Sequence, residues 1–535
     1  MNRPSIRTSL SKAAVAKRDE ALLAQLGYKQ EFKRAFKPLE VFGLSFSIIG
    51  LLPSIASVLV YALPNGGASS MVWGWAVGSL FILSVGLSIG GVGFRSTYIG
   101  RPLLLGPLPL VPSLAELTLL DRWLCEYGGV HRVGRGIYIA ILLSHAVVCS
   151  LGTTVLARLQ SVYVAINILL CIAVIIVLPV ATPKEYINSA GYALGNFTNC
   201  IYLPCFFFFL LLVKTKLTER PSHVSVNGWP NGFAFVLSLV APLWTICSFD
   251  CAVHISEEAS NAATAVPWAI VSSITVAGIL GMAINIALAF CMGTDIEYTL
   301  NSPIGQPMAQ IFFNSLGEKA TLAVWTFVVI AQYMMGSSML LGASRQTFAF
   351  ARDGALPLSN ILYRINSFTG TPVNTVWFVV FMAGLLGLLA FAGTAAINAI
   401  FTMSITSLYV AYAIPMFARF ASDNDFKPGP FSLGIFSLPI GITAIAFMAF
   451  MIIVFSFPAT PTTNAANMNY AIVVLGGVMV LSLVWYYFPV YGGIHWFTGP
   501  VPNIDADRKD ETGGMYDDYA SKEKSAEGAV NVVRV

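Results

Sequence analysis

Long apolar segments recur along this 535-residue chain and constrain its fold more than any other feature. A helix needs about 20 apolar residues to cross the hydrocarbon core of a bilayer. We place such segments at 41–62, 71–92, 136–157, 161–180, 232–255, 268–291, 321–343, 374–392, 395–417, 436–457 and 469–488. Their apolar residues are continuous and do not alternate with polar ones, so they are not the strands of a membrane barrel. The sequence predicts an all-α, multi-pass membrane protein.

The composition agrees with this prediction and excludes other classes. Only 10% of the residues are charged and 56% are hydrophobic, whereas soluble domains are about 25% charged. The net charge of +4 is too small to predict nucleic-acid binding, and no basic stripe with interleaved aromatic residues is visible. We find no ATP-binding loop, serine hydrolase elbow or zinc-ligand spacing. We therefore expect no enzyme activity, no cofactor and no metal.

The distribution of charge predicts the domain organisation. Residues 1–40 are polar and basic and lack the apolar core of a cleavable signal peptide. Lys and Arg also occur in the loops at 343–368 and 418–431, which places these loops on the cytoplasmic side with the N-terminal tail. We expect a transmembrane domain over 41–488 and a second cytoplasmic tail over 489–535.

The first apolar segment carries a predicted break. Gly50 permits backbone that is not helical, and Pro53 removes an N–H group and disfavours helical geometry at Leu52. Unwound backbone inside a bilayer must face protein, water or a ligand. The alternative is a simple proline kink.

The segment 232–255 carries an acid inside an apolar run. A carboxylate such as Asp250 at the centre of a bilayer costs about 2.5–3.5 kcal/mol. Pro242, Thr245 and Ser248 precede it and are candidates for a second break. Two interrupted helices in two halves of a chain indicate the central site of a transporter. Asp250 then holds an amine, relays a proton or closes a gate; the alternative is a structural hydrogen bond to a neighbouring helix.

Three further titratable residues follow Asp250. His254, one turn later, either forms a hydrogen bond within the bundle or assists proton transfer near neutral pH. Glu257 and Glu258 fall at the cytoplasmic end of the segment. We expect them to be gate residues or packing partners of the basic loops, and not substrate ligands.

Several stretches of the chain resemble a known family. They include "FSIIGLLPSIAS", "APLWTICSFDCAVHISEEASNAATAVPW" and "GASRQTFAFARDGALP", and they occur in the family's order over most of the chain. The chain is similar to the fungal amino acid, choline and GABA permeases of the amino acid–polyamine–organocation (APC) superfamily.

The resemblance implies a leucine-transporter-like fold with two inverted five-helix repeats and nominally twelve helices, in which the first and sixth helices are broken at the central site. The substrate-binding residues that it implies are Ser47, Gly50, Leu51, Pro53, Ser54, Thr245, Ser248, Phe249 and Asp250. Arg345 and Arg352 fall in the family's cytoplasmic loop motif after the eighth helix. The candidates for proton coupling or gating are Asp250, His254, Glu257, Glu258, Arg345 and Arg352.

The implied function is proton-coupled import of an amino acid or a related small amine, such as GABA or choline, across the plasma membrane. The partners are then a small-molecule substrate, H⁺ and the lipid bilayer, and not a nucleic acid. The alternatives are a polyamine transporter, a non-transporting nutrient sensor and an inactive relative.

Two regions depart from the family's pattern. Segment 89–135 is rich in proline where the third helix is expected, so this helix is absent or rewritten, which would reverse every later loop. Segment 200–226 holds an apolar run of about fourteen residues, which reaches only about 21 Å as a helix. We interpret both as gene-model errors, a misplaced splice boundary and a retained intron; the alternative is true divergence.

Overall fold

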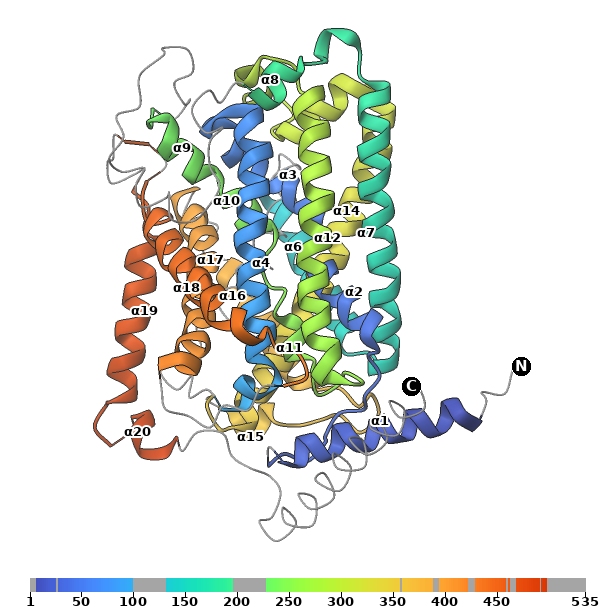
Figure 1. Ribbon diagram of the computed structural model, residues 1–535, viewed down its shortest axis with the longest axis vertical. Helices are drawn as coiled ribbons and strands as arrows, with labels where there is room; N and C mark the ends of the chain where they lie inside the picture. Colours follow the sequence, from blue (N-terminus) through green and yellow to red (C-terminus); the bar gives the residue numbers. More distant parts are fainter. Residues whose placement is uncertain are drawn as a thin grey trace, which may run out of the picture.

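The computed structural model describes residues 6–99, 131–195, 228–387, 394–421, 429–461 and 468–497, apart from positions 26, 357, 459 and 491. Long helices lie side by side in a bundle, and α1 (Ile6–Gln25) lies across one end of it (Figure 1). We call this end the N-terminal side and the opposite end the far side. Within the described ranges, the β-structure is an isolated bridge between Phe36 and Ala259. The all-α prediction is confirmed.

Helices or broken helices account for the described parts of the predicted apolar segments. In chain order these are α2 (Pro38–Ile49) with α3 (Leu51–Ala62), α4 (Gly67–Ile99), α6 (His131–Cys149), α7 (Thr153–Ala181), α9 (Asn231–Ser238) with α10 (Val240–Thr245) and α11 (Cys251–His254), α12 (Ala262–Cys291), α14 (Pro307–Arg352), α16 (Val373–Gly387), α17 (Thr394–Ala421), α18 (Ser437–Val454) and α19 (Ala471–Tyr486). By length and composition, 6 of these helices can cross a membrane, and 4 more are shorter and apolar. The connections include η1 (Leu63–Asn65), α8 (Ala190–Gly195), α13 (Ile296–Leu300), α15 (Ser359–Leu362) and α20 (Gly493–Trp496).

Two predicted boundaries were wrong. The segment 136–157 is not one helix, because α6 ends at Cys149 and extended backbone at Gly152 separates it from α7. Arg345 and Arg352 do not lie in a loop, because α14 continues to Arg352. The chain between them carries no helix breaker before Gly354, and ion pairs allow both arginines to be buried inside the bundle.

The first broken helix lies at the centre of the bundle. In the span Pro38–Asn65, which holds α2 and α3, 83% of an 18-residue apolar window is buried, whereas the corresponding share in the other candidate spans is between 33% and 56%. Small residues allow its neighbours to approach closely. A Cβ atom on Gly43 of α2 would lie 2.9 Å from the backbone oxygen of Gln160 in α7. The centre of the protein is therefore built around a helix that is interrupted.

Helices α4 and α12 also pack through a glycine. The indole of Trp75 lies over Gly281, where an added Cβ would be 2.0 Å from the ring, and it donates a hydrogen bond of 3.0 Å to the carbonyl of Gly278. The two long helices run beside each other along most of the bundle (Figure 1).

Helices α4 and α6 run in the same direction. α4 runs from the far side to the N-terminal side (Figure 1). α6 is parallel to α14, because His145 contacts the carbonyl of Tyr333 and, one turn on, the Cys149 thiol contacts that of Ser337. α14 also ends at the N-terminal side. The loops after α6 thus lie where an intact family topology puts them, and the expected reversal of these loops was wrong.

The two departing regions fall largely outside the described residues. Residues 100–130 and 196–227 are not described, so the gene-model hypothesis stays a prediction. The ends of segment 89–135 belong to α4 and α6.

Candidate functional site

The first break is centred on Gly50. This residue adopts φ 47° and ψ 56°, the left-handed conformation that glycine tolerates best, and an added Cβ would lie 2.5 Å from the Sδ of Met335 in α14. The Ser54 hydroxyl spans the break and donates a 2.8 Å hydrogen bond to the carbonyl of Ile49. Pro53 lies in the first turn of α3, where its missing N–H leaves no helical bond unmade. The interruption is therefore a true break between two helices and not a proline kink.

The second break lies between α10 and α11. Ile246 leaves helical geometry at φ −96° and ψ 59°, and Ser248 has a positive φ of 53°. Pro242, a candidate for this break, instead lies inside α10, so the helix unwinds only after Thr245. The Ser45 hydroxyl of α2 donates a 3.3 Å hydrogen bond to the carbonyl of Phe249, which joins the unwound segment to the first broken helix.

Asp250 ends the unwound segment and has two polar partners. Its Oδ1 accepts a 2.5 Å hydrogen bond from the phenol of Tyr412 on α17, and its Oδ2 lies 3.2 Å from Nε2 of His254 on α11. The Phe249 ring lies 5.7 Å from that of Tyr412, centroid to centroid. The carboxylate side chain is 15% exposed. Because a carboxylate in an apolar bundle needs donors, these contacts explain how the chain tolerates the acid.

Both broken helices also present unpaired hydroxyl groups. Ser47 Oγ on α2 and Thr245 Oγ1 at the end of α10 are buried and have no hydrogen-bond partner among the residues that the structure describes. Most buried polar atoms are paired, so each exception calls for an explanation. The Leu51 N–H at the start of α3 has no partner within the helix, and the helix dipole adds positive charge there. Donors from two helices are thus available at the centre of the bundle for a small polar ligand.

Four of the six residues predicted for proton coupling or gating form a separate layer toward the N-terminal side, while Asp250 and His254 lie at the second break. Arg345 Nε lies 2.8 Å from Glu258 Oε1, and Arg352 Nη1 lies 3.0 Å from Glu257 Oε2. All four side chains are at most 10% exposed. The glutamates therefore do pair with basic residues as expected, and the pairs join α14 to the connection between α11 and α12. Their role in gating stays a prediction.

The structure divides the predicted site residues between these two layers. Those on the first and sixth helices surround the two breaks; of these, Ser248 places its hydroxyl 3.9 Å from the Cys247 thiol. Sequence reasoning missed Tyr412, Ser45 and Met335. Nothing in the sequence distinguishes Tyr412 from other tyrosines in apolar segments, since its role depends on α17 packing against the second break.

A possible ligand cluster at the second break is explained by hydrogen bonds. Asp250, Cys251 and His254 carry ligand atoms within 4.8 Å of one another. Asp250 already has partners on both oxygens, and the Cys251 thiol packs against Gly342. A metal would have to displace these contacts.

Comparisons with known proteins agree with this geometry. A family model described as amino acid permease matches residues 113–478. The chain is 33% identical to the GABA-specific permease of Saccharomyces cerevisiae, over 96% of this chain and 91% of that protein. It is also 33% identical to an uncharacterized amino-acid permease of Schizosaccharomyces pombe, over 94% and 91% of the two chains. A putative polyamine transporter of Candida albicans is 29% identical over 91% and 89%.

Proposed function

Since the chain belongs to the amino acid permease family of the APC superfamily, we propose that it imports an amino acid or a related small amine, such as GABA or choline, across the plasma membrane by proton coupling. The family implies the leucine-transporter-like fold, and the chain is a multi-pass membrane protein. The observation that carries the proposal is Asp250, a partly accessible carboxylate at the break of one helix, whose neighbour Phe249 is hydrogen-bonded to α2 of the other broken helix.

The unpaired donors support a zwitterionic substrate. In this proposal the substrate carboxylate lies at the start of α3, where the Leu51 N–H group and the Ser47 hydroxyl donate to it. Thr245 contributes a second hydroxyl from α10. The substrate amine lies toward Asp250. Binding would then satisfy polar groups that are buried without partners in the structure.

Proton coupling is assigned to Asp250 because its carboxylate joins α11 to α17. When ionised, the carboxylate accepts a hydrogen bond from Tyr412 on α17, and it lies at the start of α11, 3.2 Å from His254, so it ties the two helices together. When one oxygen of Asp250 takes up a proton, that oxygen becomes a hydrogen-bond donor and the contact between the two helices weakens. Proton binding would thus be linked to a rearrangement of α11 relative to α17, as alternating access requires.

The charge around the breaks favours a substrate with one amine over a polyamine. A polyamine carries several ammonium groups, each of which needs a carboxylate or comparable acceptor. Within the described ranges, Glu257 and Glu258 already pair with arginines, which leaves Asp250 as the acid at the breaks. GABA is the first compound to test because one relative is named a GABA-specific permease.

Uptake measurements test the proposal. Labelled GABA, choline, a neutral amino acid and spermidine would be supplied to cells that lack their own carriers, at pH 5 and pH 7.5. We expect saturable uptake of one monoamine that is faster at pH 5. Uptake of spermidine alone would establish the polyamine alternative. A surface-expressed protein that takes up none of the four would contradict the proposal and favour a sensor or an inactive relative.

A further inference from the structure

The chain before the first broken helix crosses the N-terminal side of the bundle. Residues 14–36, which we call the clamp, comprise the second half of α1 and an extended strap that leads into α2. Leu23, Tyr28, Phe32 and Phe36 of the clamp are each at most 4% exposed. The α1 helix lies below the ends of the bundle helices (Figure 1). This segment is therefore packed as part of the protein and is not a free tail.

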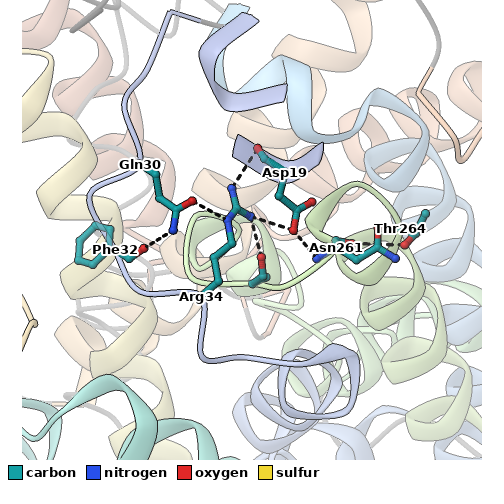
Figure 2. Close-up of polar contacts among 7 residues, drawn as sticks. Asp19, Gln30, Phe32, Arg34, Asn261 and Thr264 are labelled. Atoms are coloured by element: carbon teal, nitrogen blue, oxygen red, sulfur yellow. Dashed lines mark hydrogen bonds and ion pairs between the residues drawn. The ribbon is translucent and has the colours of Figure 1, made fainter. Parts of the chain in front are cut away.

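Arg34 fixes the clamp to itself and to the bundle. Its Nη1 lies 3.5 Å from Asp19 Oδ2 and donates a 2.8 Å hydrogen bond to the carbonyl of Ala259. Its other nitrogens donate to the carbonyl of Asp19 at 3.2 Å and to Gln30 Oε1 at 3.2 Å (Figure 2). The Arg34 side chain is 7% exposed and that of Asp19 is 5% exposed. The planar guanidinium supplies this set of directed donors, which an ammonium group cannot.

A second set of contacts fixes the clamp to the connection between α11 and α12. Asp19 Oδ2 accepts a 2.7 Å hydrogen bond from the backbone of Asn261, the residue that precedes α12 (Figure 2). Phe36 donates from its backbone to the carbonyl of Glu258 at 3.1 Å and accepts from the backbone of Ser260 at 2.8 Å. The strap is thereby joined to the segment that carries the gating glutamates.

A third set reaches α14 and α15. The Glu31 backbone donates to Glu257 Oε1 at 3.3 Å, and the Glu31 carboxylate accepts a hydrogen bond from the phenol of Tyr363 at the end of α15. The guanidinium of Arg352 on α14 lies 4.5 Å from the centre of the Tyr28 ring. The clamp therefore contacts both residues of the Glu257–Arg352 ion pair.

We propose that this clamp holds the N-terminal side closed and that its release is needed for that side to open. The clamp is bonded on both sides of the seam between α11 and α14, since it contacts the α11–α12 connection on one side and Arg352 on the other. Any movement that separates α11 from α14 must break one of these sets of clamp contacts. The N-terminal segment is thus an autoinhibitory element whose release sets how often the site opens to this side.

Modification of a native cysteine measures this opening directly. Cys251 on α11 is 3% exposed, and its thiol packs against Gly342 of α14, so it lies in the seam. The full-length protein would be placed in vesicles with the N-terminal side outward and treated with a membrane-impermeant methanethiosulfonate. Peptide mass spectrometry would give the rate of modification at Cys251. The assay needs no substrate, so it does not depend on the proposed function.

The decisive comparison is Arg34→Ala against Lys33→Ala. Arg34→Ala removes the donors and leaves Asp19 buried without its cation, and we expect Cys251 to react about tenfold faster or more. Lys33 is the neighbouring cation in the strap and is exposed, so Lys33→Ala should leave the rate unchanged. Cys291, buried at the far end of α12, is the internal control, since a rise there as well would indicate unfolding.

A second variant tests the other anchor and covers a failure of the first to fold. Tyr363→Phe keeps the ring that packs 5.2 Å from Phe348 and removes the hydrogen bond to Glu31. We expect a smaller rise in the modification rate of Cys251 than in Arg34→Ala. The double variant Arg34→Ala/Tyr363→Phe should show a larger rise than either single variant. Folded Arg34→Ala and Tyr363→Phe proteins with wild-type rates at Cys251 would overturn the proposal.

Discussion

The Tyr412 phenol donates a 2.5 Å hydrogen bond to the Asp250 carboxylate and so joins α17 to the break between α10 and α11. The two residues are 162 positions apart in the chain, and the contact forms only because α17 packs against the unwound segment. Together with His254, Tyr412 defines how the acid at the centre of this permease is held. The contact also provides a way to separate the charge of Asp250 from its hydrogen bonding.

Replacing Asp250 by Asn should abolish uptake while the protein still reaches the membrane. The amide keeps the size of the side chain and can accept from Tyr412, but it neither titrates nor carries charge. We expect uptake to fall by about a hundredfold or more, the loss expected when a buried charge partner is removed. Glu297→Gln, a neutralised acid that is exposed on α13, is the matched control. Normal transport by the Asn variant would return Asp250 to a structural role.

Tyr412→Phe should reduce uptake about tenfold or more. A hydrogen bond to a charged group contributes about 1.5–3 kcal/mol, and the Phe ring preserves the contact with Phe249. Tyr409 lies one turn earlier on α17 and is also buried, but it donates no hydrogen bond to Asp250 in the structure, so Tyr409→Phe is the control. Initial rates at pH 5 would be compared. Equal rates in the two variants would show that the phenol contributes no more than packing.

Gly50→Ala should impair both stability and transport. A left-handed conformation costs an L-residue about 1–2 kcal/mol, and the new methyl group would meet the Met335 Sδ at 2.5 Å. The measurements are thermal unfolding in detergent and uptake. Adding Met335→Ala relieves the contact and not the backbone strain, so it should restore only part of the stability. Full recovery in the double variant would show that the positive φ is unimportant.

Removing one partner of the buried Glu258–Arg345 pair should cost more than removing both. Arg345 is 3% exposed. In the Glu258→Gln variant its guanidinium stays buried without a charged partner, which should lower the free energy of unfolding by about 3–5 kcal/mol. The double variant Glu258→Gln/Arg345→Gln removes both charges, so it should be more stable than either single one. Thermal unfolding of the four proteins gives the coupling between the residues. Additive losses would mean that the charges do not interact.

The clamp should dock more tightly as the pH falls. Burial raises the pKa of the Asp19 carboxyl, although Arg34 and the Asn261 amide oppose the shift. The docked segment therefore binds a proton more readily than the released one. Its docking is strongest below the ordinary aspartate pKa of about 3.9 and weakens as the pH rises through the raised pKa.

The matched variant for this prediction is Asp19→Asn, which keeps an oxygen for the Asn261 amide and does not titrate. The ratio of Cys251 modification in the wild type to that in Asp19→Asn cancels the pH dependence of the thiol itself. We expect this ratio to rise between pH 4 and pH 8. A ratio that falls over this range would mean that the ionised form of Asp19 holds the clamp.

The apolar segments and the first break were predictable because their causes are local. A run of apolar residues decides where a helix can cross a bilayer, and Gly50 with Pro53 decides where the first helix can stop. The second break could be placed only near Asp250, since Pro242 sits in the first turn of α10, where proline is tolerated.

The partners of the site residues were not predictable from one sequence. Arg345 looks like a loop residue because its charge stands out, and its ion pair with Glu258 across the seam permits its burial in a helix. Asp19 and Arg34 read as ordinary members of a polar, basic tail. Their pairing depends on the strap folding back onto Ala259 and Asn261, which is a long-range contact.

The contact between Trp75 and Gly281 has a mechanical consequence. An indole that lies directly on a glycine leaves no room for α4 and α12 to slide past each other, and its hydrogen bond to Gly278 fixes their register. We therefore expect the two helices to move as one rigid body. We expect relative motion at the elements on either side of the two breaks, with Gly50 and the segment 246–250 as hinges and the α4–α12 pair as the frame against which they turn.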